Sequence, residues 1–195
     1  GYAGLAPLER GLTNVAFVSA SSALSGRDGP LDAYFEEGLA RIPAVAERLG
    51  GAVRVGGIRG VGPLAHRVTR AAGDGYLLVG DAAAFLDPFT GDGMYEAMRA
   101  GQLAAPVASA AIRGRDVSAR ALRPYRLARW RTFGAKRQVC WIVQGFIHAP
   151  ILMDYVTDRL DRREELGLTL SGVLGNFRPA SAALSPLFLA RLLRP

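Results

Sequence analysis

The chain has 195 residues, half of them hydrophobic, so it can bury a core and is not expected to be disordered. It carries 24 basic and 17 acidic residues, a formal net charge of +7, and Lys136 is its only lysine. The single cysteine, Cys140, excludes an internal disulfide and any cysteine-based metal cluster, and its apolar neighbours favour a buried structural thiol. No apolar stretch reaches the roughly 20 residues of a membrane-spanning helix, and no signal-peptide pattern is found, so we expect a cytoplasmic protein.

The N-terminal part of the chain reads as a hairpin followed by a helix. Extended segments at 2–6 and 12–20 flank a turn, and apolar residues alternate on both sides of the second segment. This pattern predicts a hairpin that is covered on both faces. Helical spacing then predicts a helix over 31–49, which Pro43 should kink or split.

Residues 53–70 read as extended segments interrupted by glycine, before a tight turn at 73–75. The continuous apolar run at 76–80 is typical of a parallel strand that is buried on both faces. The segment 60–65 formally fits the GxGxx(G/A) pattern of dinucleotide-binding loops. We reject it, because the ten residues at 66–75 leave no room for the crossover helix that such a loop needs.

The remainder of the chain is expected to be helical. From Asp92, small and apolar residues recur on one face at spacings of three and four, which would let that helix lie close against a sheet. Further helices are expected at about 118–135, 136–160 and 182–193, separated by glycine and proline. The residues of the small, apolar face are Met94, Ala97, Met98, Gly101, Ala105 and Ala108.

Two features of the helical region have more than one interpretation. The basic residues of 120–137 alternate with apolar ones and are interpreted as a solvated helix face, ahead of an anionic-lipid or nucleic-acid site. The segment 141–155 is apolar around most of its circumference, which favours a buried helix. Alternatively it lines an apolar substrate channel or rests on a membrane, with Trp141 and Phe146 as substrate-pocket candidates. The basic residues of the helix face are Arg123, Arg126, Arg129, Arg131 and Arg137.

The segment 80–94, GDAAAFLDPFTGDGM, says most about function. Asp81 directly follows the expected strand, at the sheet edge where open α/β folds bind ligands, and its carboxylate can accept hydrogen bonds from sugar-type hydroxyls. The loop beyond it holds Pro88, Gly91 and Gly93 and opens a helix. The positive N-terminal end of that helix favours a negatively charged ligand, such as the N1–C2=O edge of a reduced flavin.

This segment resembles the second flavin motif of the para-hydroxybenzoate-hydroxylase-like flavoproteins, and residues 87–101 are most similar to their geranylgeranyl-reductase branch. The resemblance implies FAD as the cofactor, with Asp81 on its ribityl or pyrophosphate side and Pro88 against the flavin ring. The backbone N–H groups at 91–94 would then meet the pyrimidine edge of the ring. The cofactor-binding residues expected in this way are Gly80, Asp81, Pro88, Gly91, Asp92, Gly93 and Met94.

The remaining polar candidates receive simpler interpretations. Asp92 is interpreted as a helix-start residue, and Asp87 is left open. His66 and His148 are the only histidines, lack a nearby ligand pattern and are interpreted as structural. No metal site and no catalytic side chain is identified, since in flavoenzymes the cofactor carries the redox step.

The resemblance implies an α/β (α+β) fold in which parts of two domains alternate along the chain. Residues 1–70 would belong to a substrate-domain sheet with one helix, and 71–115 to the strand and helix of a Rossmann-like FAD-binding domain. Residues 116–195 would form a helical C-terminal region. The GxGxxG half of the FAD site is absent from these 195 residues, so we expect the chain to be incomplete and inactive alone.

The expected function is that of an FAD-dependent oxidoreductase with an apolar organic or prenyl-type substrate, in which NAD(P)H or another donor reduces the flavin. Hydride transfer to a C=C bond and monooxygenation of an aromatic or polyketide-like substrate remain alternatives. A non-catalytic fragment or a basic lipid-surface binding module is a third alternative. Peripheral contact with a membrane is a further possibility. We expect no nucleic-acid partner.

Overall fold

The computed structural model describes residues 1–25, 28–85, 88–147 and 149–194, so Asp87 and His148 lie outside the described residues. The chain divides into two compact units, Gly1–Pro63 and Leu64–Pro195. The predicted division of the chain at residues 70 and 115 stays a prediction.

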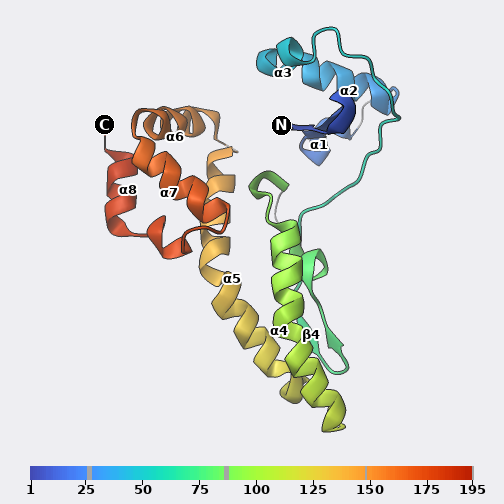
Figure 1. The fold of residues 1–195 in the computed structure, drawn as a ribbon, viewed down its shortest axis with the longest axis vertical. Coiled ribbons are helices and arrows are strands. Elements are labelled where there is room, and N and C mark those ends of the chain that lie inside the picture. Colours follow the sequence, from blue (N-terminus) through green and yellow to red (C-terminus); the bar gives the residue numbers. More distant parts are fainter. Residues whose placement is uncertain (26–27, 86–87, 148, 195) are drawn as a thin grey trace. The chain divides into compact units, whose positions relative to one another are not determined.

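The first unit is the predicted hairpin with helices beside it (Figure 1). The strands pair antiparallel from Tyr2 opposite Val18 to Pro7 opposite Thr13, which confirms the hairpin. Pro43 begins a new helix and so splits the predicted helix as expected. The elements are β1 (Tyr2–Pro7), β2 (Thr13–Val18), α1 (Ser21–Leu24), α2 (Leu31–Ala40) and α3 (Pro43–Arg48).

Phe17 of β2 joins the hairpin to α2. Its ring centroid lies 5.9 Å from that of Tyr34 and 6.5 Å from that of Phe35. A Cβ atom at Gly38 would lie only 2.5 Å from the Phe17 ring, so only glycine lets α2 approach this closely. The prediction that both faces of the hairpin are covered is wrong within this unit, because α2 covers one face and several strand residues stay exposed.

The second unit opens with short antiparallel pairs of strands. β3 (His66–Arg67) pairs with β6 (Ala84–Phe85), and β4 (Ala72–Gly73) pairs with β5 (Tyr76–Leu77). The predicted parallel strand at 76–80 is therefore wrong. The turn at Gly75, with φ of 75°, folds the apolar run back onto β4 as a hairpin. The described residues between 65 and 76 contain no helix, which confirms that 60–65 is not a dinucleotide-binding loop.

Helices make up most of the second unit, as predicted (Figure 1). The fold of the described residues is thus α+β, and the expected sheet of a Rossmann-like domain is not part of it. The two expected helices at 118–135 and 136–160 are instead one continuous helix to residue 147 and a second from residue 150. The helices are α4 (Gly93–Arg113), α5 (Ala119–Ile147), α6 (Pro150–Arg162), α7 (Glu164–Leu174) and α8 (Pro186–Leu193).

Two apolar cores lie along α5. One surrounds the fully buried Tyr125, where α5 meets α4 and the β4–β5 hairpin. The other surrounds Val173, where α6, α7 and α8 pack on the C-terminal half of α5. No single described helix is long and apolar enough to cross a membrane, although α5 and Ile151–Arg162, bent by 117°, meet that requirement as a pair by length and composition alone.

The face of α4 that packs against α5 differs from the predicted one. Ala100, Ala104 and Ala111 are buried, whereas Met94 is 80% exposed and Met98 is 67% exposed. Both faces of this helix carry small residues, so periodicity alone could not distinguish them. The predicted face was expected to lie against a sheet; in this unit its Ala97 approaches Gly80, whereas Met94 and Met98 are exposed.

Hydrogen bonds fasten the β4–β5 hairpin to the start of α5. The backbone N–H of Ala119 donates to Asp74 Oδ1 at 2.6 Å, and that of Gly75 donates to the Val117 carbonyl at 2.8 Å. The Tyr125 hydroxyl donates to the Leu78 carbonyl at 2.6 Å. This hairpin leads directly into 80–94, so these bonds help to hold the candidate site in place.

We predict that Tyr125→Phe lowers the free energy of unfolding by about 1–3 kcal/mol, because it leaves the Leu78 carbonyl without its donor inside the core. Urea unfolding monitored by circular dichroism measures the effect. The control is Tyr95→Phe on the exposed side of α4, which should change the free energy by less than about 0.5 kcal/mol. Equal losses in both variants would show that the Tyr125 bond does not hold the hairpin.

Cys140 is buried, as predicted, and burial raises the pKa of its thiol to about 11. At pH 8 only about one molecule in a thousand would then carry the reactive thiolate, against about a quarter in the unfolded chain. We therefore predict that a thiol reagent labels the folded protein about a hundredfold or more slowly than the urea-unfolded one. Equal labelling rates before and after unfolding would contradict the buried placement.

Candidate functional site

The described residues of 80–94, which are 80–85 and 88–94, lie between the short strands and α4. Gly80 has φ of 54°, and a Cβ atom there would lie 3.0 Å from the Cβ of Ala97. Only glycine allows both this backbone conformation and this approach to α4. As a result Asp81 lies beside the start of the helix, where a Cβ atom on Gly93 would be 3.6 Å from Asp81 Oδ1.

The start of α4 is open on the side away from α5. Gly91 has φ of 67°, and its N–H donates to the Pro88 carbonyl at 3.0 Å, so this N–H is used within the loop. Gly93 and Met94 occupy the first helical positions, whose N–H groups have no acceptor within the helix. Pro88 and Met94 are exposed.

The structure therefore brings Gly80, Asp81 and the first turn of α4 together, as the resemblance implies. The combination of an exposed carboxylate and an uncapped helix N-terminus suits a ligand that has hydroxyl groups and an anionic edge. The individual roles of these residues toward FAD stay predictions.

Asp92 is at the N-cap position of α4, but its side chain does not cap the helix, so the helix-start interpretation is wrong for the carboxylate. Asp92 is turned toward α5 instead. Its Oδ1 accepts hydrogen bonds from Lys136 Nζ at 3.1 Å and from Asn176 Nδ2 at 2.7 Å, and its Oδ2 lies 3.0 Å from Nζ. The buried ammonium outcompetes the backbone N–H groups for this carboxylate, because a charge-assisted bond is the stronger one.

Lys136, the only lysine of the chain, is 8% exposed and is surrounded by acceptors. Besides Asp92, its Nζ donates to the carbonyls of Val173 at 2.8 Å and Leu174 at 2.6 Å, and to Asn176 Oδ1 at 3.0 Å. We call Lys136, Asp92, Asn176 and the two carbonyls the Lys136 network. Every partner of Nζ is an oxygen acceptor, and the three N–H groups of the ammonium are shared among them.

A second group of charges lies one turn further along α4. Glu96 Oε2 is 3.6 Å from Arg137 Nη2 and 4.0 Å from Arg129 Nη2. Arg129 is only 5% exposed, and burial, reinforced by the charge of Arg137, lowers the pKa of its guanidinium. The interpretation of the basic residues as one solvated face is thus wrong for Arg129 and Arg137. Arg123, Arg126 and Arg131 are exposed, and their interpretation as a solvated face, ahead of an anionic-lipid or nucleic-acid site, stays a prediction.

Sequence analysis missed the roles of Lys136, Asn176 and Glu96. One signal was available, since Lys136 is a lone lysine among arginines and its compact ammonium can bond several acceptors in a buried site. The partners of Lys136 lie 37 to 44 positions away in the chain, and no local pattern connects them.

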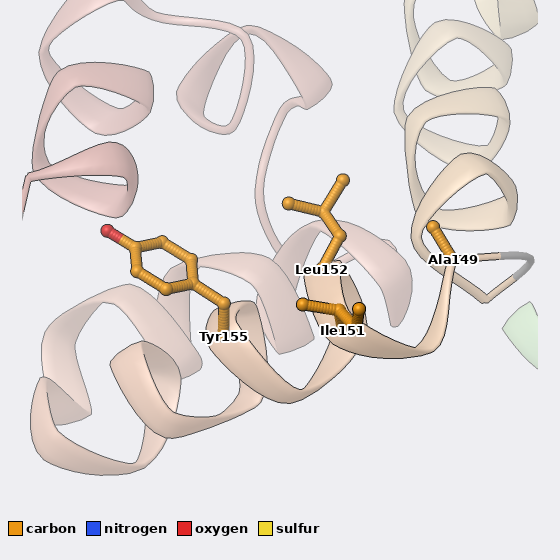
Figure 2. Close-up of a pocket in the computed structure, with 4 residues that line it drawn as sticks. All are labelled: Ala149, Ile151, Leu152 and Tyr155. Carbon is orange, nitrogen blue, oxygen red and sulfur yellow. The ribbon is translucent and has the colours of Figure 1, made fainter.

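The predicted substrate-pocket residues do not lie together in the structure. Trp141 is 57% exposed, and Phe146 packs against the core around Val173. Among the described residues, an open apolar hollow of about 510 Å³ is lined by Ala149, Ile151, Leu152 and Tyr155 at the start of α6 (Figure 2). Trp141 and the 89% exposed Ile151 also show that 141–155 is not a fully buried helix in this chain.

His66 is exposed, and its Nδ1 lies 2.9 Å from the Leu64 carbonyl, in keeping with a structural role. Within the described ranges, no group of three His, Cys, Asp or Glu side chains could hold a metal ion.

No protein-family model matches the chain. It is 33% identical over 144 residues to the digeranylgeranylglycerophospholipid reductase of Methanocaldococcus jannaschii, covering 73% of the chain and 34% of that protein. It is 29% identical over 154 residues to a 1H-pyrrole-2-carbonyl-(peptidyl-carrier protein) brominase of Pseudoalteromonas luteoviolacea, covering 73% of the chain and 37% of the relative. A flavin-dependent halogenase of Armillaria mellea is 32% identical over 128 residues, covering 58% of the chain and 24% of the halogenase.

The chain thus spans about a third or less of the length of these relatives. The relatives are a digeranylgeranylglycerophospholipid reductase, a brominase and a flavin-dependent halogenase, which confirms the resemblance seen in 80–101. The chain belongs to the superfamily of FAD-dependent oxidoreductases that includes the geranylgeranyl reductases, the flavin-dependent halogenases and the related monooxygenases.

Proposed function

We propose that the chain forms the ring-side part of the FAD site in an oxidoreductase that acts on an apolar substrate. The observation that carries this proposal is the position of Asp81 beside the first turn of α4. An acceptor for sugar-type hydroxyls and a donor for an anionic edge lie next to each other, as a ribityl chain and a flavin ring require.

The residues present at the candidate site fit a flavin. Glycine at 91 and 93 leaves the helix start free of side chains, since a Cβ atom at Gly91 would meet nothing within 4 Å. When bound, FAD supplies the redox chemistry of the reaction. In this proposal Asp81 orients the ribityl side, and the N–H groups of Gly93 and Met94 stabilise negative charge on the ring edge.

The substrate class and the electron donor are part of the proposal. The names of the relatives specify a phospholipid in one case and a carrier-protein-bound pyrrole in another. The hollow beside Ile151, Leu152 and Tyr155 offers an apolar surface for such a group. We propose an apolar organic or prenyl-type substrate, NAD(P)H or another donor for the flavin, and contact with a membrane surface when the substrate is a lipid.

We predict that Asp81→Ala in the full-length protein weakens FAD binding about tenfold or more, because it removes a charged acceptor worth about 1.5–3 kcal/mol. Flavin retention on a desalting column and fluorescence titration with FAD measure the loss. The control is Asp161→Ala, an exposed acid on α6, which should retain flavin like the unmodified protein. Unchanged retention with Asp81→Ala, at an unchanged melting temperature, would remove Asp81 from the site.

The reaction of the reduced flavin with oxygen distinguishes a reductase from a monooxygenase or a halogenase. We expect a reductase to consume one molecule of the electron donor for each C=C bond that it reduces, without taking up oxygen. A monooxygenase would couple oxygen uptake to hydroxylation, and a halogenase would couple it to halide consumption. Stopped-flow oxidation of the reduced full-length protein, with and without an apolar alkene substrate, measures this difference.

A further inference from the structure

Two helix ends, the buried Lys136 and Asp92 form a series of alternating charge. The last carbonyls of α7, at Val173 and Leu174, lie at the negative end of that helix and accept bonds from Lys136 Nζ. The ammonium then meets Asp92, which lies at the positive end of α4. The series therefore runs from the end of α7 through Lys136 and Asp92 to the start of α4.

Asn176 completes this connection. It has φ of 63°, a conformation in which asparagine is better tolerated than most residues, just beyond the end of α7. From there its carboxamide accepts from Lys136 at 3.0 Å and donates to Asp92 at 2.7 Å. A displacement of α7 relative to α4 would break several of these bonds together.

The charges behind the start of α4 do not cancel. Asp92 and Glu96 contribute two negative charges, whereas Lys136, Arg129 and Arg137 contribute three positive ones, which leaves one positive charge in excess. Lys136 and Arg129 are buried, so water screens these charges less than surface charges. In front of the helix the Asp81 carboxylate offsets this excess, so an anion there is favoured by the positive end of α4.

We propose that Lys136 is a positioning residue for the flavin, which neutralises Asp92, ties the start of α4 to the end of α7, and so maintains a positive potential at the ring-side helix end. This inference rests on the proposed FAD site. Lys136 does not touch the ring edge itself, because its ammonium is occupied by Asp92, Asn176 and the end of α7. Its effect reaches the ring through α4.

The test measures the midpoint potential of the bound flavin by dye equilibration in the full-length protein. In Lys136→Met the Asp92 carboxylate loses its counter-charge, so the reduced, anionic flavin should bind about tenfold more weakly relative to the oxidised form. For a two-electron couple this tenfold change lowers the midpoint potential by about 30 mV.

Two further variants keep the proposal testable if Lys136→Met does not fold. Asp92→Asn removes the negative charge at nearly constant shape and should raise the midpoint potential. The double variant Asp92→Asn/Lys136→Met removes both charges and should return the potential toward the original value. Asn176→Gly is the structural control. Glycine adopts the same backbone conformation and leaves the charges of Lys136 and Asp92 in place, but it removes the carboxamide that bonds to both of them. It should lower the melting temperature and shift the potential much less than Lys136→Met.

Opposite shifts in the two single-charge variants, cancelling in the double variant, would establish the role of Lys136. A potential that stays constant in Lys136→Met and Asp92→Asn while the melting temperature falls would reduce Lys136 to a structural residue. Neither result is confused with failure of the proposed function, since that failure appears as an absence of bound FAD in the unmodified protein.

Discussion

The contact between Lys136 and Asp92 is the interaction on which the arrangement of the second unit depends. Within the Lys136 network it links α4 and α5 to the end of α7, through contacts between residues 37 to 84 positions apart in the chain. An isolated buried charge would be costly, so the network is stable only when α4, α5 and the end of α7 are all in place. The start of α4 is consequently held by the C-terminal helices, although the candidate cofactor site belongs to the segment that precedes them.

One face of α4 packs against α5, and the opposite face stays exposed at the candidate site. The face with Ala100, Ala104 and Ala111 packs against α5, and Asp92 and Glu96 at the start of the helix pair with the cations of α5. The opposite face, with Met94 and Met98, stays exposed beside Asp81 and Gly93. The acids near the helix start are thus turned away from the site. A second negative charge near Asp81 would oppose an anionic ligand, and the pairing with α5 neutralises both acids.

Local sequence rules predicted the local features well. The hairpin at β1 and β2, the helix break at Pro43 and the helix that follows Asp92 depend on turns, on proline and on periodicity within a few residues. The glycines at 80, 91 and 93 also indicated a close approach of backbone. Their φ values and contacts show why other residues would not fit at two of them, since Gly91 has φ of 67° and Gly80 has both φ of 54° and a tight contact with Ala97. The candidate site could therefore be located from the sequence, because its geometry is encoded in consecutive residues.

The features that sequence analysis predicted incorrectly depend on a local turn in one case and on partners far along the chain in the others. The run at 76–80 is apolar enough for a buried strand, but β4 and the turn at Gly75 take it into a hairpin. The sequence around Arg129 is typical of a surface arginine, but in the structure Glu96 of α4 lies against its guanidinium. Asp92 has the sequence position of a cap, and only the distant Lys136 makes it an ion pair. A polar residue at a helix start can thus cap its own helix or form an ion pair with a neighbouring helix. Which of the two it does depends on whether the tertiary fold brings a buried cation within reach of its side chain.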